Sequence, residues 1–234
     1  VLGVADGESY IASDVPAILK YTRSVYYIAN LEMARVRKGE ITFYNLDGEE
    51  IEKEPKVIDW DAEAAEKAGF EHFMIKEIHE QPRAIKDTLN SVLKDGEIDL
   101  SEVGLDEEEI QKISQIYIVA CGSAYHVGVA AQYVIEDLAQ IPVRVELASE
   151  FRYRKQLMNP NDLVIIISQS GETADSLAAL RESKKKGIRT LGIVNVIGSS
   201  IAREADNVFY TLAGPEISVA TTKAYSTQLI ATYT

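Results

Sequence analysis

The chain has only one cysteine and three histidines among its 234 residues, and it has no long apolar run. The single cysteine, Cys121, excludes an internal disulfide bond and suits a reducing compartment, so we expect a cytoplasmic protein. The histidines do not cluster with other metal ligands, and we therefore expect no metal site. No apolar stretch reaches the roughly 18 residues that a membrane-spanning helix needs, so no membrane segment is expected.

Basic residues are also scarce. The chain has 24 Lys and Arg against 37 Asp and Glu, which gives a formal net charge of −13. Such a charge repels nucleic acid unless the basic residues cluster. The longest basic run, Lys184-Lys185-Lys186, is expected to close a helix and face solvent, because cations favour a helix C-terminus. We therefore expect no nucleic-acid partner.

The first 72 residues are rich in short β-branched and aromatic runs, which predict strands. A hairpin is predicted between residues 41–44 and 50–54, because Asn45-Leu46-Asp47-Gly48 supplies turn chemistry. A short helix is expected after residue 13, where Ser13 or Asp14 offers a cap.

Residues 73–114 are dominated by helix-forming and acidic residues. A helix is predicted over residues 73–93, where apolar or helix-compatible side chains recur every three or four positions: Ile78, Pro82, Ile85, Leu89 and Val92. Residues 97–109 carry seven acidic and no basic residues, which is typical of a solvated linker. Within it, Asp106 and Glu109 have the spacing of a capping box at a helix start.

Residues 115–234 alternate between apolar strands and helices. Strands are predicted at 116–120, 143–147, 163–167, 190–194 and 207–211, and helices at 124–138, 174–186 and 199–205. This alternation predicts an α/β fold: an αβα sandwich around a five-stranded parallel sheet. Ligands of such sheets bind beyond the carboxyl ends of the strands.

Three loops fall at those strand ends. The most informative is Ser168-Gln169-Ser170-Gly171-Glu172-Thr173, in which an apolar strand stops in a hydroxyl-rich turn at a helix start. Backbone N–H groups and the helix dipole favour an anion there. The loop has no lysine and no magnesium ligand, so it suits a phosphate that is held without being transferred. Helix capping with surface polarity is the alternative.

The other two loops are less specific. Cys121-Gly122-Ser123-Ala124 offers a tight turn with a hydroxyl and backbone N–H groups, yet it is also an ordinary strand-to-helix turn. Residues 214–223 form an ordinary loop on spacing alone, in which Lys223 either faces a ligand or has no particular partner. Cys121 is expected to be a small buried hydrophobe, since a nucleophile would need a neighbouring histidine and His126 lies about one turn into the next helix.

The run from Ser168 to Thr173 closely resembles the phosphate loop of SIS (sugar isomerase) domains. Together with residues 121–123, 148–154, 195–200 and 214–223, it resembles the glucosamine-6-phosphate synthases, the isomerising glutamine–fructose-6-phosphate aminotransferases. Residues 7–14 resemble the end of that family's glutaminase domain, which is an N-terminal-nucleophile hydrolase. Residues 73–86 resemble the helix that opens its isomerase half.

The resemblance implies three parts: residues 1–72 as the β-rich end of the glutaminase domain, 73–114 as a helical entry to the isomerase half, and 115–234 as the first SIS domain, cut in its last helix. It also implies an enzyme that transfers ammonia from glutamine to fructose 6-phosphate and yields glucosamine 6-phosphate, as a homodimer without cofactor or metal.

The site residues implied by the resemblance fall into three groups. The sugar phosphate would be held by Ser123, Ala124, Ser168, Gln169, Ser170 and Thr173. The sugar would be lined by Gly122, Val219, Ala220 and Thr221. Asp14 matches the glutaminase aspartate that pairs with the amino group of glutamine.

The sequence departs from the family pattern in two ways. Many relatives read Cys-Gly-Thr-Ser in the first loop, so Ala124 lacks a hydroxyl worth about 1 kcal/mol and would offer its backbone N–H instead. The nucleophilic cysteine of the glutaminase and the whole second SIS domain are absent from the sequence. The chain begins like a strand interior and ends like an unfinished helix, so we expect a fragment with no catalytic residue that binds phosphosugar at most. The alternative is a non-catalytic phosphosugar sensor built on an SIS domain.

Overall fold

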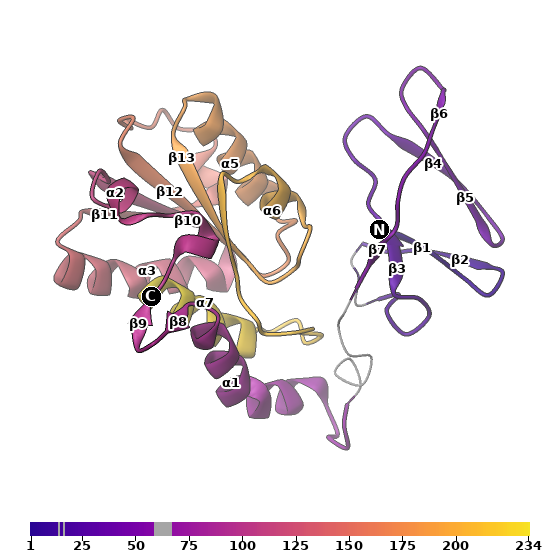
Figure 1. Cartoon of the computed structure of the whole chain (residues 1–234), viewed down its shortest axis with the longest axis horizontal. Coiled ribbons are helices and arrows are strands. Elements are labelled where there is room, and N and C mark those ends of the chain that lie inside the picture. Colours follow the sequence, from indigo (N-terminus) through magenta and orange to yellow (C-terminus); the bar gives the residue numbers. More distant parts are fainter. Residues whose placement is uncertain (14, 16, 59–66) are drawn as a thin grey trace. The chain divides into compact units, whose positions relative to one another are not determined.

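The computed structural model describes residues 1–13, 15, 17–58 and 67–234. It divides the chain into two compact units, Val1–Phe73 and Met74–Thr234 (Figure 1). Among the described residues, none of the helices combines the length and the apolar character that crossing a bilayer requires.

The first unit is built from antiparallel strands. Its strands among the described residues are β1 (Leu2–Ala5), β2 (Glu8–Ile11), β3 (Ser24–Tyr26), β4 (Met33–Arg37), β5 (Glu40–Tyr44), β6 (Glu50–Ile51) and β7 (Lys56–Val57). They form one sheet in the order β2-β1-β3-β7 and another in the order β4-β5-β6. The predicted hairpin is confirmed, because Tyr44 pairs with Glu50 across β5 and β6.

The helix expected after residue 13 is not seen in the described residues there. Residues 17–21 form turns, in which the Leu19 N–H donates to the Val15 carbonyl and the Thr22 N–H donates to the Ile18 carbonyl. Val15, Ile18 and Leu19 are buried with Val25 in a small core, so packing holds this turn without a regular helix. Asp14 lies outside the described residues.

The second unit alternates helices and strands. Its elements are α1 (Phe73–Asn90), β8 (Leu93–Lys94), β9 (Glu97–Ile98), the 3₁₀ helix η2 (Ser101–Val103), α2 (Glu107–Ile110), β10 (Gln115–Ala120), α3 (Gly122–Ala139), β11 (Val143–Leu147), α4 (Ala148–Phe151), β12 (Asp162–Ser168), α5 (Ala174–Lys185), β13 (Arg189–Val194), α6 (Ser200–Glu204), β14 (Asn207–Tyr210) and α7 (Lys223–Tyr233).

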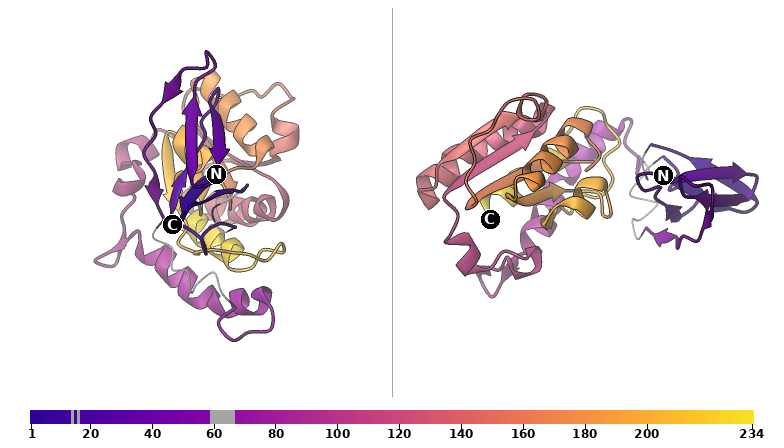
Figure 2. Two further views of the ribbon diagram at one scale, coloured as in Figure 1. Left: turned by 90° about the vertical axis from the view of Figure 1, so that its right-hand side faces the viewer. Right: turned by 90° about the horizontal axis from the view of Figure 1, so that it is seen from above.

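The predicted five-stranded parallel sheet is confirmed, in residues 67–234 that the structure describes without a gap. Its strand order is β11-β10-β12-β13-β14, and every neighbouring pair is parallel. Alternate side chains of each strand enter opposite cores. Ile116 and Ile118 of β10 pack with α3 and α7, whereas Tyr117 and Val119 pack with α4, α5 and α6. Helices therefore cover both faces of the sheet, and Figure 2 gives two further views of these layers.

The helix predicted over residues 73–93 is confirmed as α1, but its buried face differs from the apolar positions. The buried residues are Lys76, Glu77, Ala84 and Thr88, whereas Ile78 is 39% exposed. Charged side chains are rarely buried unless they are paired, so α1 must have polar partners elsewhere in the unit.

The acidic segment after α1 is more ordered than a solvated linker. It forms the β8–β9 hairpin, η2 and α2, and it contributes Val103 and Leu105 to the core beside the sheet. The predicted capping box is confirmed, because the Asp106 carboxylate accepts the Glu109 N–H at 2.8 Å.

Candidate functional site

A cavity of about 230 Å³ lies where three loops meet beyond the carboxyl ends of β10, β12 and β14. It is lined by Cys121, Ser123, Ala124, Ile167, Ser168, Gln169, Ser170, Thr173, Glu216, Ser218, Val219, Thr221 and Gln228. All of these residues are described, and none of them is a lysine, an arginine or a histidine. An anion in this cavity would therefore be held by neutral donors.

The loop between β12 and α5 is folded around its own hydroxyl groups. Ser168 is 3% exposed, and its Oγ lies 3.0 Å from Thr173 Oγ1 while accepting the Gly171 N–H at 3.1 Å. Ser170 Oγ accepts the Glu172 N–H at 3.2 Å. These bonds hold the hydroxyls at fixed positions beside the cavity, which is the preorganisation that anion binding needs.

Two long helices begin at this cavity without a side-chain cap. Neither Cys121, at the start of α3, nor Thr173, at the start of α5, accepts a side-chain hydrogen bond from its helix. The first N–H groups of a helix have no partner inside the helix and carry the positive end of its dipole. The one acidic side chain in the first turn of α5, Asp175, is paired with Arg152 at 2.6 Å. Both helix starts therefore favour an anion.

The back of the β12–α5 loop rests on the turn that precedes α6. Gly171 has a backbone φ of +67°, and a Cβ built there would lie 2.0 Å from Ser199 Oγ. The Glu172 carboxylate accepts the Ser200 N–H at 2.7 Å, and the Ile201 N–H donates to the Gly171 carbonyl at 3.0 Å. The shape of the loop thus depends on the position of α6.

A bidentate ion pair holds α6 against α5. The Arg181 guanidinium donates to both carboxylate oxygens of Glu204, at 2.6 and 2.7 Å. These hydrogen bonds from Arg181 hold the pKa of Glu204 below its usual range. Since α6 supports the β12–α5 loop, this pair contributes indirectly to the geometry of the cavity.

The third loop is held in place by two glutamates. Glu216 lines the cavity, and its carboxylate accepts the N–H groups of Thr222 and Ala224, at 2.8 and 3.1 Å, at the start of α7. Glu77 of α1 is 1% exposed and accepts the N–H groups of Ile217 and Ser218, at 2.6 and 3.2 Å. Both carboxylates accept backbone N–H groups, so their role in this structure is to fix the path of the third loop.

Lys223 does not line the cavity. It is 3% exposed, and its Nζ donates to Glu80 of α1 at 2.6 Å, next to Lys76 at 3.5 Å from the same carboxylate. Neither of the two alternatives that the sequence left open is seen, because Lys223 does not line the cavity and has Glu80 as a specific partner. The lysine fastens α7 to α1.

Most residues predicted for the site are brought together by the fold. Ser123, Ala124, Ser168, Gln169, Ser170, Thr173, Val219 and Thr221 all line the one cavity. Gly122 and Ala220 are exposed and are sequence neighbours of lining residues without lining the cavity themselves. Asp14 lies outside the described residues. The role of each residue in binding stays a prediction.

Sequence reasoning assigned no site role to several lining or supporting residues, among them Glu77, Glu216 and Gln228. Glu77 and Gln228 lie inside helices, where neither has a sequence signature, and Glu216 lies in a loop that appeared ordinary. The burial of Glu77 on α1, which only the structure shows, is the signal that identifies it.

Cys121 is partly buried and lines the cavity. Its sulfur accepts a hydrogen bond from Ser176 Oγ at 3.8 Å, and His126 is exposed and stacks edge-on against Tyr125. Cys121 is therefore less buried than the sequence predicted, and its hydrogen-bond partner is a hydroxyl group. That it is not a nucleophile stays a prediction.

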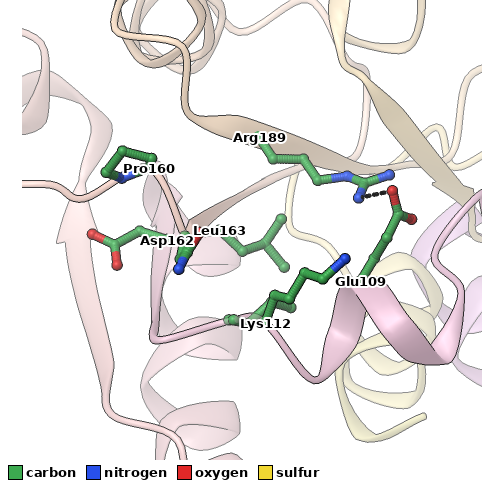
Figure 3. A pocket seen from close by; sticks show the side chains of 8 residues that line it. Glu109, Lys112, Pro160, Asp162, Leu163 and Arg189 are labelled. Carbon is green, nitrogen blue, oxygen red and sulfur yellow. Dashed lines mark ion pairs between the residues drawn. The ribbon is translucent and has the colours of Figure 1, made fainter.

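A second pocket, of about 210 Å³, lies at the other ends of the strands, where β12 and β13 begin (Figure 3). Its cation Arg189 donates to Glu109 at 2.5 Å, to Asn207 at 2.8 Å and to the Gly104 carbonyl at 3.1 Å. Lys112 is paired with Glu108 at 2.7 Å. Arg189 and Lys112 already have partners within the protein. We therefore interpret this pocket as part of the packing contact between the segment before β10 and the sheet.

The SIS domain model matches residues 109–234 of the chain. Over all 234 residues the chain is 57% identical to the isomerising glutamine–fructose-6-phosphate aminotransferase of Caldanaerobacter subterraneus subsp. tengcongensis, and 55% identical to that of Clostridium acetobutylicum. It spans 38% of the length of each of these curated relatives.

Among solved structures, the C-terminal domain of glucosamine-fructose-6-phosphate aminotransferase from Francisella tularensis is similar, with a TM-score of 0.68 and 48% identity. The alignment covers 72% of this chain and 47% of that one. The family match includes all three loops and the whole five-stranded sheet, and the chain therefore belongs to the SIS domain family.

Proposed function

We propose that the cavity binds the phosphate of fructose 6-phosphate, and that the chain is the sugar-phosphate-binding part of an isomerising glutamine–fructose-6-phosphate aminotransferase. The observation that carries this proposal is the cavity itself. Ser168, Ser170 and Thr173 present hydroxyls beside two uncapped helix starts, and no cation lines the cavity. A phosphate monoester fits such a site, because neutral donors bind the dianion without activating it for transfer.

The activity of the whole protein is proposed from its relatives. It would take ammonia from glutamine and deliver it to fructose 6-phosphate, giving glucosamine 6-phosphate, as a cytoplasmic homodimer without cofactor or metal. Residues 1–72 would be the end of the glutaminase domain, with Asp14 at the glutamine site, 73–114 the entry to the isomerase half, and 115–234 the first SIS domain. The similarity to these enzymes extends over the first unit as well, which favours the enzyme over a phosphosugar sensor.

Calorimetric titration of the 234-residue chain with fructose 6-phosphate tests the phosphate site. The double variant Ser170→Ala/Thr173→Ala removes two hydroxyls from the cavity and is expected to weaken binding roughly 100-fold. This value corresponds to about 3 kcal/mol for two hydrogen bonds to a charged group.

The matched control is Ser149→Ala/Thr232→Ala, which also removes two hydroxyls but none that lines the cavity. It should bind with the affinity of the parent, and the melting temperature of each variant reports on folding. A Ser170→Ala/Thr173→Ala variant that is folded and binds as tightly as the parent would show that the phosphate lies elsewhere.

A further inference from the structure

Gln228 lines the cavity, yet its side chain makes no hydrogen bond to any residue that the structure describes. It lies on α7 and is only 3% exposed. The other polar side chains on its part of the helix are satisfied: Ser226 Oγ donates to Gln81 at 2.6 Å, and Thr227 Oγ1 donates to the Ala224 carbonyl at 2.9 Å. Gln228 thus differs from these two neighbours on the helix.

Gln228 lines the cavity, so its amide can be reached by a molecule bound there. A polar group in such a position, without a hydrogen bond inside the protein, can pair with a ligand at no cost to an existing bond. The hydroxyls of the β12–α5 loop form hydrogen bonds with one another and with backbone groups of that loop. They form none with the Gln228 amide. The amide therefore has both its oxygen and its NH₂ group available to a ligand.

An amide both donates and accepts hydrogen bonds, whereas a phosphate dianion only accepts them. A phosphate partner would leave the amide oxygen unsatisfied, but a sugar hydroxyl can bond with both amide groups. Gln228 also lies on an element distinct from the two helix starts that favour the anion. Its chemistry and its place in the cavity both suit the hydroxyl-bearing part of a phosphosugar.

We propose that Gln228 is a ligand-binding residue that recognises a hydroxyl group of the sugar, while the β12–α5 loop holds the phosphate. This assignment rests on the proposed function, because it presupposes that a phosphosugar occupies the cavity. It makes Gln228 a source of discrimination between a phosphosugar and phosphate alone, since a site with an amide left unpaired rejects ligands that lack the matching group.

The test is the substitution Gln228→Met, which keeps the length of the side chain and removes its hydrogen-bonding groups. Calorimetry with fructose 6-phosphate is expected to show binding about 5- to 10-fold weaker than for the parent. Inorganic phosphate, measured as a competitor of fructose 6-phosphate, should bind the parent and the variant equally. The melting temperature without ligand should be unchanged, because the amide makes no hydrogen bond within the described part of the protein.

Gln132→Met is the matched control. Gln132 lies on the neighbouring α3, and its amide donates to the Val143 carbonyl at 2.9 Å without lining the cavity. Its replacement should lower the melting temperature and leave the affinity unchanged, which is the reverse of the pattern expected for Gln228→Met.

Three outcomes would overturn the assignment. If Gln228→Met binds fructose 6-phosphate like the parent while Ser170→Ala/Thr173→Ala does not, Gln228 is not a ligand residue, although the phosphate site stands. If phosphate alone is weakened as much as the phosphosugar, the amide acts on the phosphate and not on the sugar. A parent chain that binds no fructose 6-phosphate would refute the proposed function and this assignment together.

Discussion

At the scale of single residues, Gly171 sets the path of the β12–α5 loop. Its positive φ is a conformation that residues with a Cβ adopt only at a cost, and Ser199 occupies the space that a Cβ would need. The sequence predicted a tight turn here, between a strand and a helix start. It could not predict that the neighbour is Ser199, because that contact arises only when α6 packs against α5.

Gly171→Ala should therefore destabilise the fold by about 2–4 kcal/mol, from backbone strain and overpacking together. Gly187→Ala is the matched control, because Gly187 has a φ of +71° but no heavy atom within 4 Å of a Cβ built there. It should cost only about 1–2 kcal/mol, from strain alone. Urea unfolding measures both changes, and equal losses in the two variants would contradict the proposed clash with Ser199.

At the scale of elements, one face of α1 fastens the segment that follows β14. Glu77 accepts backbone N–H groups of Ile217 and Ser218, Glu80 pairs with Lys223, and Thr88 Oγ1 accepts the Leu212 N–H at 3.1 Å. The spacing of these residues places them on one side of the helix. The sequence predicted the helix correctly from its periodicity, but it could not predict a buried polar face whose partners lie more than 120 residues later.

Glu77→Gln should destabilise the chain by about 1–3 kcal/mol, because it replaces charge-assisted hydrogen bonds to buried N–H groups with weaker ones. Binding of fructose 6-phosphate should weaken as well, since Ser218 lines the cavity. The control Glu108→Gln breaks an exposed ion pair with Lys112 and should cost less than about 1 kcal/mol. Thermal melting and calorimetry check both variants, and a Glu77→Gln variant with the stability and affinity of Glu108→Gln would refute the role of α1.

At the scale of the whole molecule, the α/β architecture was predictable because buried parallel strands leave near-continuous apolar runs in the sequence. Val164, Ile165 and Ile166 of β12 are all at most 7% exposed, which that pattern requires. The strand order was not predictable from these runs, since β10 pairs with both β11 and β12 through contacts between residues far apart in sequence. The meeting of the three loops at the carboxyl ends of the strands was predictable, because ligands of parallel sheets bind there, but the contribution of Gln228 from α7 to the cavity was not.

Every residue that lines the cavity belongs to the unit Met74–Thr234, as do both cores that flank the sheet. We therefore expect residues 74–234, expressed alone, to fold and to bind fructose 6-phosphate with the affinity of the whole chain. Circular dichroism checks the fold, and calorimetry checks the affinity. Loss of binding by a folded 74–234 protein would mean that the first unit contributes to the site.

The hydrogen bond between Glu77 and Ile217 joins residues that are 140 positions apart. During synthesis at about 5–20 residues per second, α1 leaves the ribosome many seconds before the segment that it will hold. In that interval the Glu77 carboxylate stays in water, and the third wall of the cavity does not exist. The first two loops of the cavity lie nearer to α1 in the sequence, so the cavity can be completed only after residues 217 and 218 have been synthesised.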